Sequence, residues 1–208
     1  MKSFKALLSN RLPLLLLLFT FGITTLSCQS NTDRMEKMPM GTAEDITYAK
    51  QLWNTMKVEK LVGSNATKTK PFIGAARPHG WILELLYQNI SVGTHTGFIV
   101  VKKNYNGSGV SVDTVEADRA RYLSSITIMV QREAGYDEDN LNWFWAKYKP
   151  DGSLYTKEMK GMKFALAGRI AKGKTPDETS GCIYCHRSAG GGDYIFFPEI
   201  KLPGFNAD

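Results

Sequence analysis

Residues 97–105 read Gly-Phe-Ile-Val-Val-Lys-Lys-Asn-Tyr, and this stretch decides which class of fold the chain can adopt. It is short, rich in β-branched side chains and apolar at both alternating sets of positions. These properties predict a central β-strand that is buried on both faces. In such a strand Lys102 lies in phase with Phe98 and Val100, whereas Lys103 points to the opposite face.

More strands are predicted on both sides of this segment. The stretch 122–131 alternates, with Ile126, Ile128 and Val130 on one face and Ser125, Thr127 and Met129 on the other. The other strands are expected at residues 81–88, 110–115 and 142–149, and residues 153–157 would pair back after the Pro-Asp-Gly turn at 150–152.

One helix is expected at each end of the domain. Residues 42–59 carry apolar side chains at helical spacing, and Thr42 can cap this helix with Asp45 at its third position. A second helix is expected to begin near Pro176 and to end at the glycines 190–192. The chain is therefore predicted to form an α+β domain, mainly antiparallel sheet, with an N-terminal and a C-terminal helix.

The N-terminus has the pattern of an export signal. Basic residues precede a short apolar run with five consecutive leucines at 14–18, and small residues then lead to Cys28. This pattern predicts a signal peptide at residues 1–27 and not a spanning helix. The segment resembles a lipobox with Cys28 as the lipidated residue, although Thr25 departs from the usual leucine. Ordinary signal cleavage with a free Cys28 is the alternative.

Export would divide the chain into a flexible tether at 28–41 and a folded domain at 42–208. Lipidation predicts a membrane-anchored protein on the periplasmic side, and Gln29 favours the outer membrane. The full chain has 26 basic and 20 acidic residues, and the signal carries three of the basic ones. The remaining net charge of +3 is too weak to indicate a nucleic-acid partner.

The run Cys182-Ile183-Tyr184-Cys185-His186 is a C-x-x-C-H motif. Its spacing is the attachment signature of c-type haem, in which two thiols bind the porphyrin and the histidine ligates the iron. We therefore predict one covalent haem c on the second helix, with His186 as an axial ligand. A redox dithiol is one alternative, and half of a zinc site is another, with His79 and His95 as the only other histidines.

A C-terminal haem motif on a β-rich body resembles the cytochrome P-460 family, which includes the c-prime-beta cytochromes. The resemblance covers roughly residues 42–200. It is carried by Pro78-His79-Gly80, the strand at 97–102, residues 136–139, Asn-Trp-Phe-Trp-Ala-Lys-Tyr at 142–148, the turn at 150–152 and Gly181 to His186.

This resemblance implies a five-coordinate haem with His186 as the proximal ligand and an open distal face. Members that oxidise hydroxylamine carry a lysine joined to the porphyrin, and Lys102 is the matching position; a structural lysine is the alternative. They also need a carboxylate over the iron, which the strand at 122–131 lacks. A ligand such as nitric oxide or a related nitrogen species is therefore expected.

Two further functions stay open. A hydroxylamine or nitric oxide oxidoreductase would need an acid from elsewhere, such as Glu84 or Glu133. An electron-transfer cytochrome would need a sixth ligand, for which Met129, His79 and His95 are candidates. The sequence does not decide whether the chain is an enzyme, which redox partner it uses, or whether it forms a homodimer.

Overall fold

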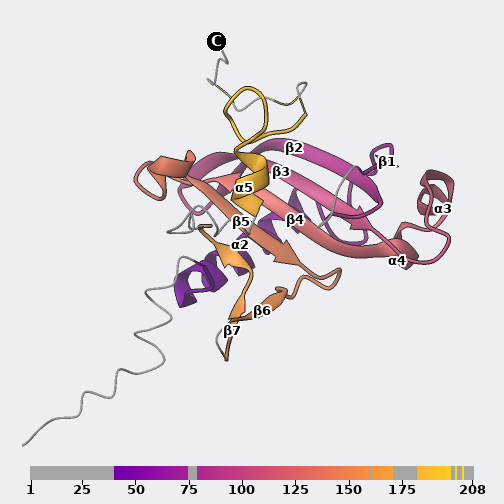
Figure 1. Cartoon of the computed structure of the whole chain (residues 1–208), viewed down its shortest axis with the longest axis horizontal. Helices are drawn as coiled ribbons and strands as arrows, with labels where there is room; N and C mark the ends of the chain where they lie inside the picture. Colours follow the sequence, from indigo (N-terminus) through magenta and orange to yellow (C-terminus); the bar gives the residue numbers. More distant parts are fainter. Residues whose placement is uncertain are drawn as a thin grey trace, which may run out of the picture.

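The computed structural model describes residues 40–74, 79–159, 161–170 and 182–197, together with residues 200 and 203. Its centre is an antiparallel sheet, with helix α2 (Ala43–Val58) on one face and helix α5 (Cys182–His186) on the other (Figure 1). Cys28 and the predicted start of the second helix near Pro176 lie outside the described residues. The α+β class, the N-terminal helix and the mainly antiparallel sheet agree with the prediction.

The main sheet has six strands in the order β1-β2-β3-β4-β5-β8, and each neighbouring pair is antiparallel. The prediction of a central strand is confirmed, because β3 lies between the long strands β2 and β4. The strands are β1 (Phe72–Ile73), β2 (Ile82–Val92), β3 (His95–Tyr105), β4 (Leu123–Gln131), β5 (Trp143–Tyr148) and β8 (Ala167–Gly168).

The alternation of β3 and β4 separates two hydrophobic clusters. On the face that α2 covers, Ile99 and Val101 of β3 pack with Ile126 and Ile128 of β4 and with helix side chains that include Leu52. On the other face, Phe98, Val100 and Met129 pack with Ile183 of α5 and with the C-terminal segment around Tyr194. Each fully buried aliphatic side chain contributes about 1.5–3 kcal/mol, so both faces stabilise the sheet.

Helix α2 begins where the sequence predicts. The Thr42 side chain accepts a hydrogen bond from the Asp45 backbone, and the Asp45 carboxylate accepts one from the Thr42 backbone. This capping box satisfies two N–H groups that the first helical turn would otherwise leave unpaired. The apolar stripe of the helix, which includes Ala49, Leu52 and Met56, is buried against the sheet.

One local prediction is wrong, and another holds in part. Residues 110–115 do not form a strand, because Ser111 and Thr114 make a capping box that starts helix α3 (Val112–Ala117). Residues 153–155 pair back onto β5 as predicted, through the bridge between Leu154 and Tyr148 and two flanking backbone hydrogen bonds, from Lys149 to Ser153 and from Tyr155 to Lys147. Strand β6 (Thr156–Met159) instead pairs with β7 (Met162–Ala165) in a separate two-stranded sheet.

The remaining helices are short. Helix α4 (Arg119–Tyr122) leads directly into β4, and a 3-10 turn (Glu138–Asn140) precedes β5. Among the described residues, no helix combines the length and apolar character needed to cross a bilayer.

Candidate functional site

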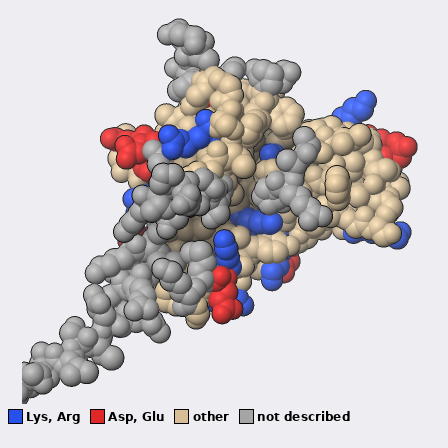
Figure 2. Space-filling model, in the orientation of Figure 1, with Lys and Arg blue, Asp and Glu red and all other residues tan. Residues whose placement is uncertain are grey.

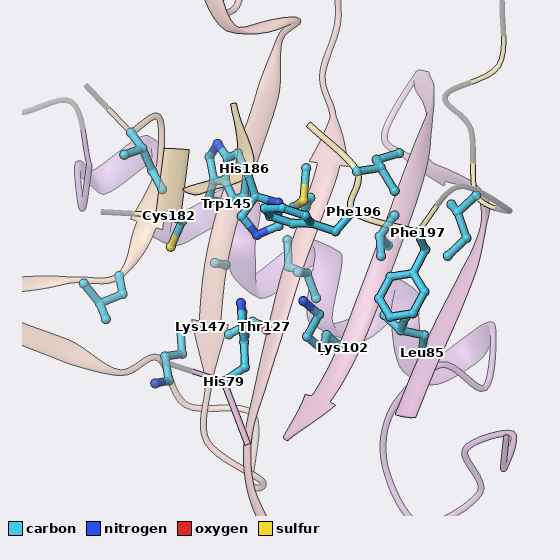
Figure 3. A pocket seen from close by; sticks show the side chains of 18 of the residues that line it. His79, Leu85, Lys102, Thr127, Trp145, Lys147, Cys182, His186, Phe196 and Phe197 are labelled. Atoms are coloured by element: carbon cyan, nitrogen blue, oxygen red, sulfur yellow. The ribbon is translucent and has the colours of Figure 1, made fainter. Parts of the chain in front are cut away.

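A cavity lies on the α5 face of the sheet, between the strands and the C-terminal segment (Figure 3). Its empty space is about 860 Å³ including the open mouth. The lining is predominantly apolar, and strands β2 to β5 provide its floor through residues that include Leu85, Val100, Met129 and Trp145.

Helix α5 brings His186 to this cavity. Ile183 is fully buried and fixes the single helical turn against the sheet, while the His186 side chain enters the cavity beside Trp145 and Phe196. His186 Nδ1 lies 2.7 Å from the Tyr194 carbonyl oxygen. When Nδ1 donates to this carbonyl, the hydrogen bond fixes the ring and leaves Nε2 as the acceptor nitrogen, which is a common arrangement for a metal-binding histidine.

The environment also keeps the His186 imidazole neutral. Burial, together with the charge of the nearby Lys102, lowers the pKa of His186 to about 4, although the hydrogen bond to Tyr194 opposes the shift. A neutral imidazole is the form that binds a metal. The His186 imidazole would therefore need no deprotonation to bind a metal near neutral pH.

The two cysteines of the motif are free thiols on exposed positions of α5. Cys182 also lines the cavity, so its sulfur lies at the boundary between the cavity and solvent. Although Cys182 has exposed surface, neighbouring protein atoms desolvate the thiol and raise its pKa. Redox-active dithiols depend on a lowered thiol pKa, so this environment disfavours the dithiol alternative.

Strand parity places Lys102 and Lys103 on opposite faces, as predicted. Lys102 lines the cavity, next to its register partners Leu85 on β2 and Thr127 on β4. Burial lowers the pKa of Lys102 to about 8, which gives this amine more neutral character than an exposed lysine has. Figure 3 shows its ammonium group directed toward the space below His186.

No acidic side chain lines the cavity among the described residues. Glu84 is fully buried on the opposite face of the sheet, where it contacts Tyr105 and Arg119. Glu133 is exposed and pairs with its neighbour Arg132. In Figure 2, Lys and Arg side chains are visible near the middle of the α5 face, while the visible Asp and Glu side chains lie toward its edges. Neither Glu84 nor Glu133 therefore provides the acid that hydroxylamine chemistry would need.

Several further predicted candidates can now be placed. Met129 and Trp145 line the cavity, whereas Phe144 packs into the cluster on the α2 face. His95 is the first residue of β3, and its Nε2 lies 3.2 Å from the Gln131 carbonyl oxygen. His79 lines the cavity opposite His186. Of the three candidates for a sixth ligand, His95 is therefore the one outside the cavity.

The sequence did not reveal the C-terminal part of this lining. Ile195, Phe196, Phe197 and Ile200 close over the cavity after the glycines that follow α5. The apolar character of these four residues indicates that they are buried. It does not indicate which surface they cover, because they show no repeating pattern.

Two buried nitrogen atoms of the lining have no hydrogen-bond partner, namely Nδ1 of His79 and Nε1 of Trp145. Buried polar atoms in folded proteins are generally satisfied, so orphaned atoms around one cavity suggest a polar or metal-containing occupant. Among the described residues, no group of three or more His, Cys, Asp or Glu side chains could hold a metal ion by itself. The lining thus suits a cofactor that brings its own metal better than it suits a bare ion.

Comparisons with protein-family models, with curated proteins and with solved structures find no match for this chain.

Proposed function

We propose that this chain is an exported c-type monohaem protein of the cytochrome P-460 type that binds nitric oxide or a related small nitrogen species. The observation that carries the proposal is the arrangement around α5. A histidine with one nitrogen held by a backbone carbonyl stands beside two free thiols, at a predominantly apolar cavity without acidic lining.

The residues of α5 have separate tasks in this proposal. Cys182 and Cys185 attach the porphyrin, and His186 ligates the iron through Nε2. Three- and four-residue spacing on one helical turn keeps these side chains near one another. When bound, the haem supplies an iron that takes up small diatomic ligands. The chain supplies the predominantly apolar walls, which suit a small uncharged ligand.

Hydroxylamine oxidation is the second candidate, and Lys102 is the observation in its favour. Its amine faces the cavity and has a pKa of about 8, so it is better suited to bond with a porphyrin than an exposed lysine. The absence of an acid among the described lining residues argues against turnover, because protons leaving the substrate would lack an acceptor carboxylate. An electron-transfer role is the third candidate, supported by Met129 or His79 as a sixth ligand.

The proposal includes export and anchoring through Cys28 on the periplasmic side, with the outer membrane favoured. It rests on the sequence pattern of residues 1–28. An anchored haem domain would meet small ligands that diffuse across the outer membrane.

Covalent haem attachment is tested first. Protein made with an intact haem c maturation system should show a haem-stained band at its own mass after denaturing electrophoresis. The double variant Cys182→Ser/Cys185→Ser should lose this band, while Cys28→Ser should retain it as a matched control. Wild-type protein without covalent haem would refute the proposal.

Ligand chemistry is tested on the holo-protein. We expect nitric oxide and carbon monoxide to bind the ferrous form, and hydroxylamine to be oxidised slowly or not at all. Rapid hydroxylamine oxidation by the wild type would favour the second candidate. A ferrous protein that resists carbon monoxide at all concentrations would favour the electron carrier.

A further inference from the structure

His79 and His186 face each other across the cavity. Their ring centroids lie 6.2 Å apart, and the ring planes are nearly perpendicular, at 82°. In Figure 3, His79 enters from the side that also carries Lys102, and His186 enters from the side of α5 and Trp145. The two imidazoles therefore approach the same space from opposite directions.

This separation matches the span of one metal centre. Two imidazoles that bind one metal from opposite sides, with metal–nitrogen distances of about 2 Å, have centroids roughly 6 to 6.5 Å apart. The observed separation is within this span. If a diatomic ligand also occupied the space between the iron and His79, the two rings would have to lie farther apart than they do.

Each ring has a nitrogen that is available. His186 uses Nδ1 toward the Tyr194 carbonyl, and the buried Nδ1 of His79 has no hydrogen-bond partner. The residue after His79 is held in place by Asn104, which accepts a hydrogen bond from the Gly80 backbone at 3.1 Å and donates to Thr127 Oγ1 at 3.2 Å. Gly80 is thereby tied to β3 and β4.

The position of His79 supports ligation by this residue, because its ring lines the cavity and faces the ring of His186. The competing candidates are less suitable. Met129 lies on β4, within the paired region of the sheet, and its side chain packs in the hydrophobic cluster. His95 is engaged with Gln131 and does not line the cavity.

We propose that His79 is the second axial ligand of the haem iron in the resting protein, and that an incoming diatomic ligand must displace it. The inference rests on the proposed haem at His186. It adds a resting state in which two histidines bind the iron, and the ligand-binding form arises when His79 leaves. Apparent affinity for nitric oxide or carbon monoxide is then reduced by the fraction of protein in which His79 is bound.

The test uses ferric and ferrous holo-protein with covalent haem. Wild type should be low-spin by optical and electron paramagnetic resonance spectra, and His79→Ala should be high-spin. Added imidazole should return the variant to the low-spin form. Carbon monoxide should bind to ferrous His79→Ala with about tenfold or higher apparent affinity, because the internal competitor is gone. His95→Ala is the matched control, with wild-type spectra.

The alternatives give different results. A high-spin wild type whose spectrum His79→Ala does not alter overturns the inference but leaves the proposed function intact. A low-spin spectrum that survives in His79→Ala also overturns it and points to Met129. Wild-type protein without covalent haem overturns both proposals. Circular dichroism checks the fold of each variant, and His79→Gln should give the same high-spin spectrum if the alanine variant does not fold.

Discussion

Replacing Glu84 with alanine should destabilise the protein without affecting the haem site. Glu84 is fully buried on the α2 side of the sheet. Its carboxylate accepts hydrogen bonds from Tyr105 Oη and from Arg119 Nε, the latter at 2.9 Å, and lies 4.0 Å from Lys103 Nζ. The two basic side chains are themselves largely buried, with exposed fractions of 7% for Lys103 and 20% for Arg119.

The magnitude follows from what the substitution leaves behind. Glu84→Ala creates two buried cations without their carboxylate and a tyrosine hydroxyl without its acceptor. Removing one partner of a buried ion pair costs about 3–5 kcal/mol in the free energy of unfolding. At about 2–4 °C per kcal/mol for a domain of this size, the melting temperature should fall by roughly 6–20 °C. Glu84→Gln keeps an acceptor for Tyr105 and should cost less.

Thermal and urea unfolding, followed by circular dichroism, measure this loss. Glu133→Gln is the matched control, because the Glu133 side chain is 48% exposed and solvent screens its pair with Arg132, which should contribute less than about 1 kcal/mol. Haem content, optical spectrum and carbon monoxide affinity of folded Glu84→Ala should equal those of the wild type. A loss of less than about 1 kcal/mol would refute the reasoning about the buried network. A changed haem spectrum would show that Glu84 acts on the cavity after all.

The remaining predictions concern the cavity and the anchor. Lys102→Ala should shift the main absorption band if this lysine is joined to the porphyrin. Lys147→Ala removes another lysine of the same lining and should leave the band unchanged. An unchanged spectrum in both variants means that Lys102 is structural. Cys28→Ser should move the protein from the membrane to the soluble periplasmic fraction, and a wild type that is already soluble contradicts lipidation. Leu85→Glu should place a carboxylate in the lining beside Lys102, the register partner of Leu85. This variant should oxidise hydroxylamine about tenfold or more faster than Leu85→Gln. Equal rates in the two variants would contradict the inference that turnover needs a carboxylate at the cavity.

The sequence was sufficient for the inner strands β3 and β4, because their side-chain pattern is local. The alternation in β4 and the apolar run in β3 directly determine which residues share a face, and the structure confirms both assignments. The start of α2 was equally predictable, since Thr42 and Asp45 make their capping bonds within one turn. Helix α3 contradicts the predicted strand at 110–115, because Val110, Val112 and Val115 fit a strand by residue type but the Ser111 cap starts a helix at Val112.

The cavity was only partly predictable, because several of its residues meet through long-range contacts. Cys182, Cys185 and His186 form a recognisable local motif, and parity placed Lys102 and Met129 on the correct face. The place of His79 in the cavity depends on the pairing of β2 with β3 and on the bond between Asn104 and Gly80, which lie 24 residues apart. No periodic pattern in the sequence contains that information.

The register between β2 and β3 links the fold to the chemistry of the site. Glu84 pairs with Lys103, and the next residue, Leu85, pairs with Lys102. A slip of one residue in β2 would turn Glu84 into the cavity and Leu85 into the buried ion network, because neighbouring side chains point to opposite faces. That exchange would leave Arg119 and Lys103 without their carboxylate. The ion network therefore stabilises the one register in which the described lining of the cavity has two lysines and two histidines but no acid. This lining favours ligand binding over proton-coupled oxidation.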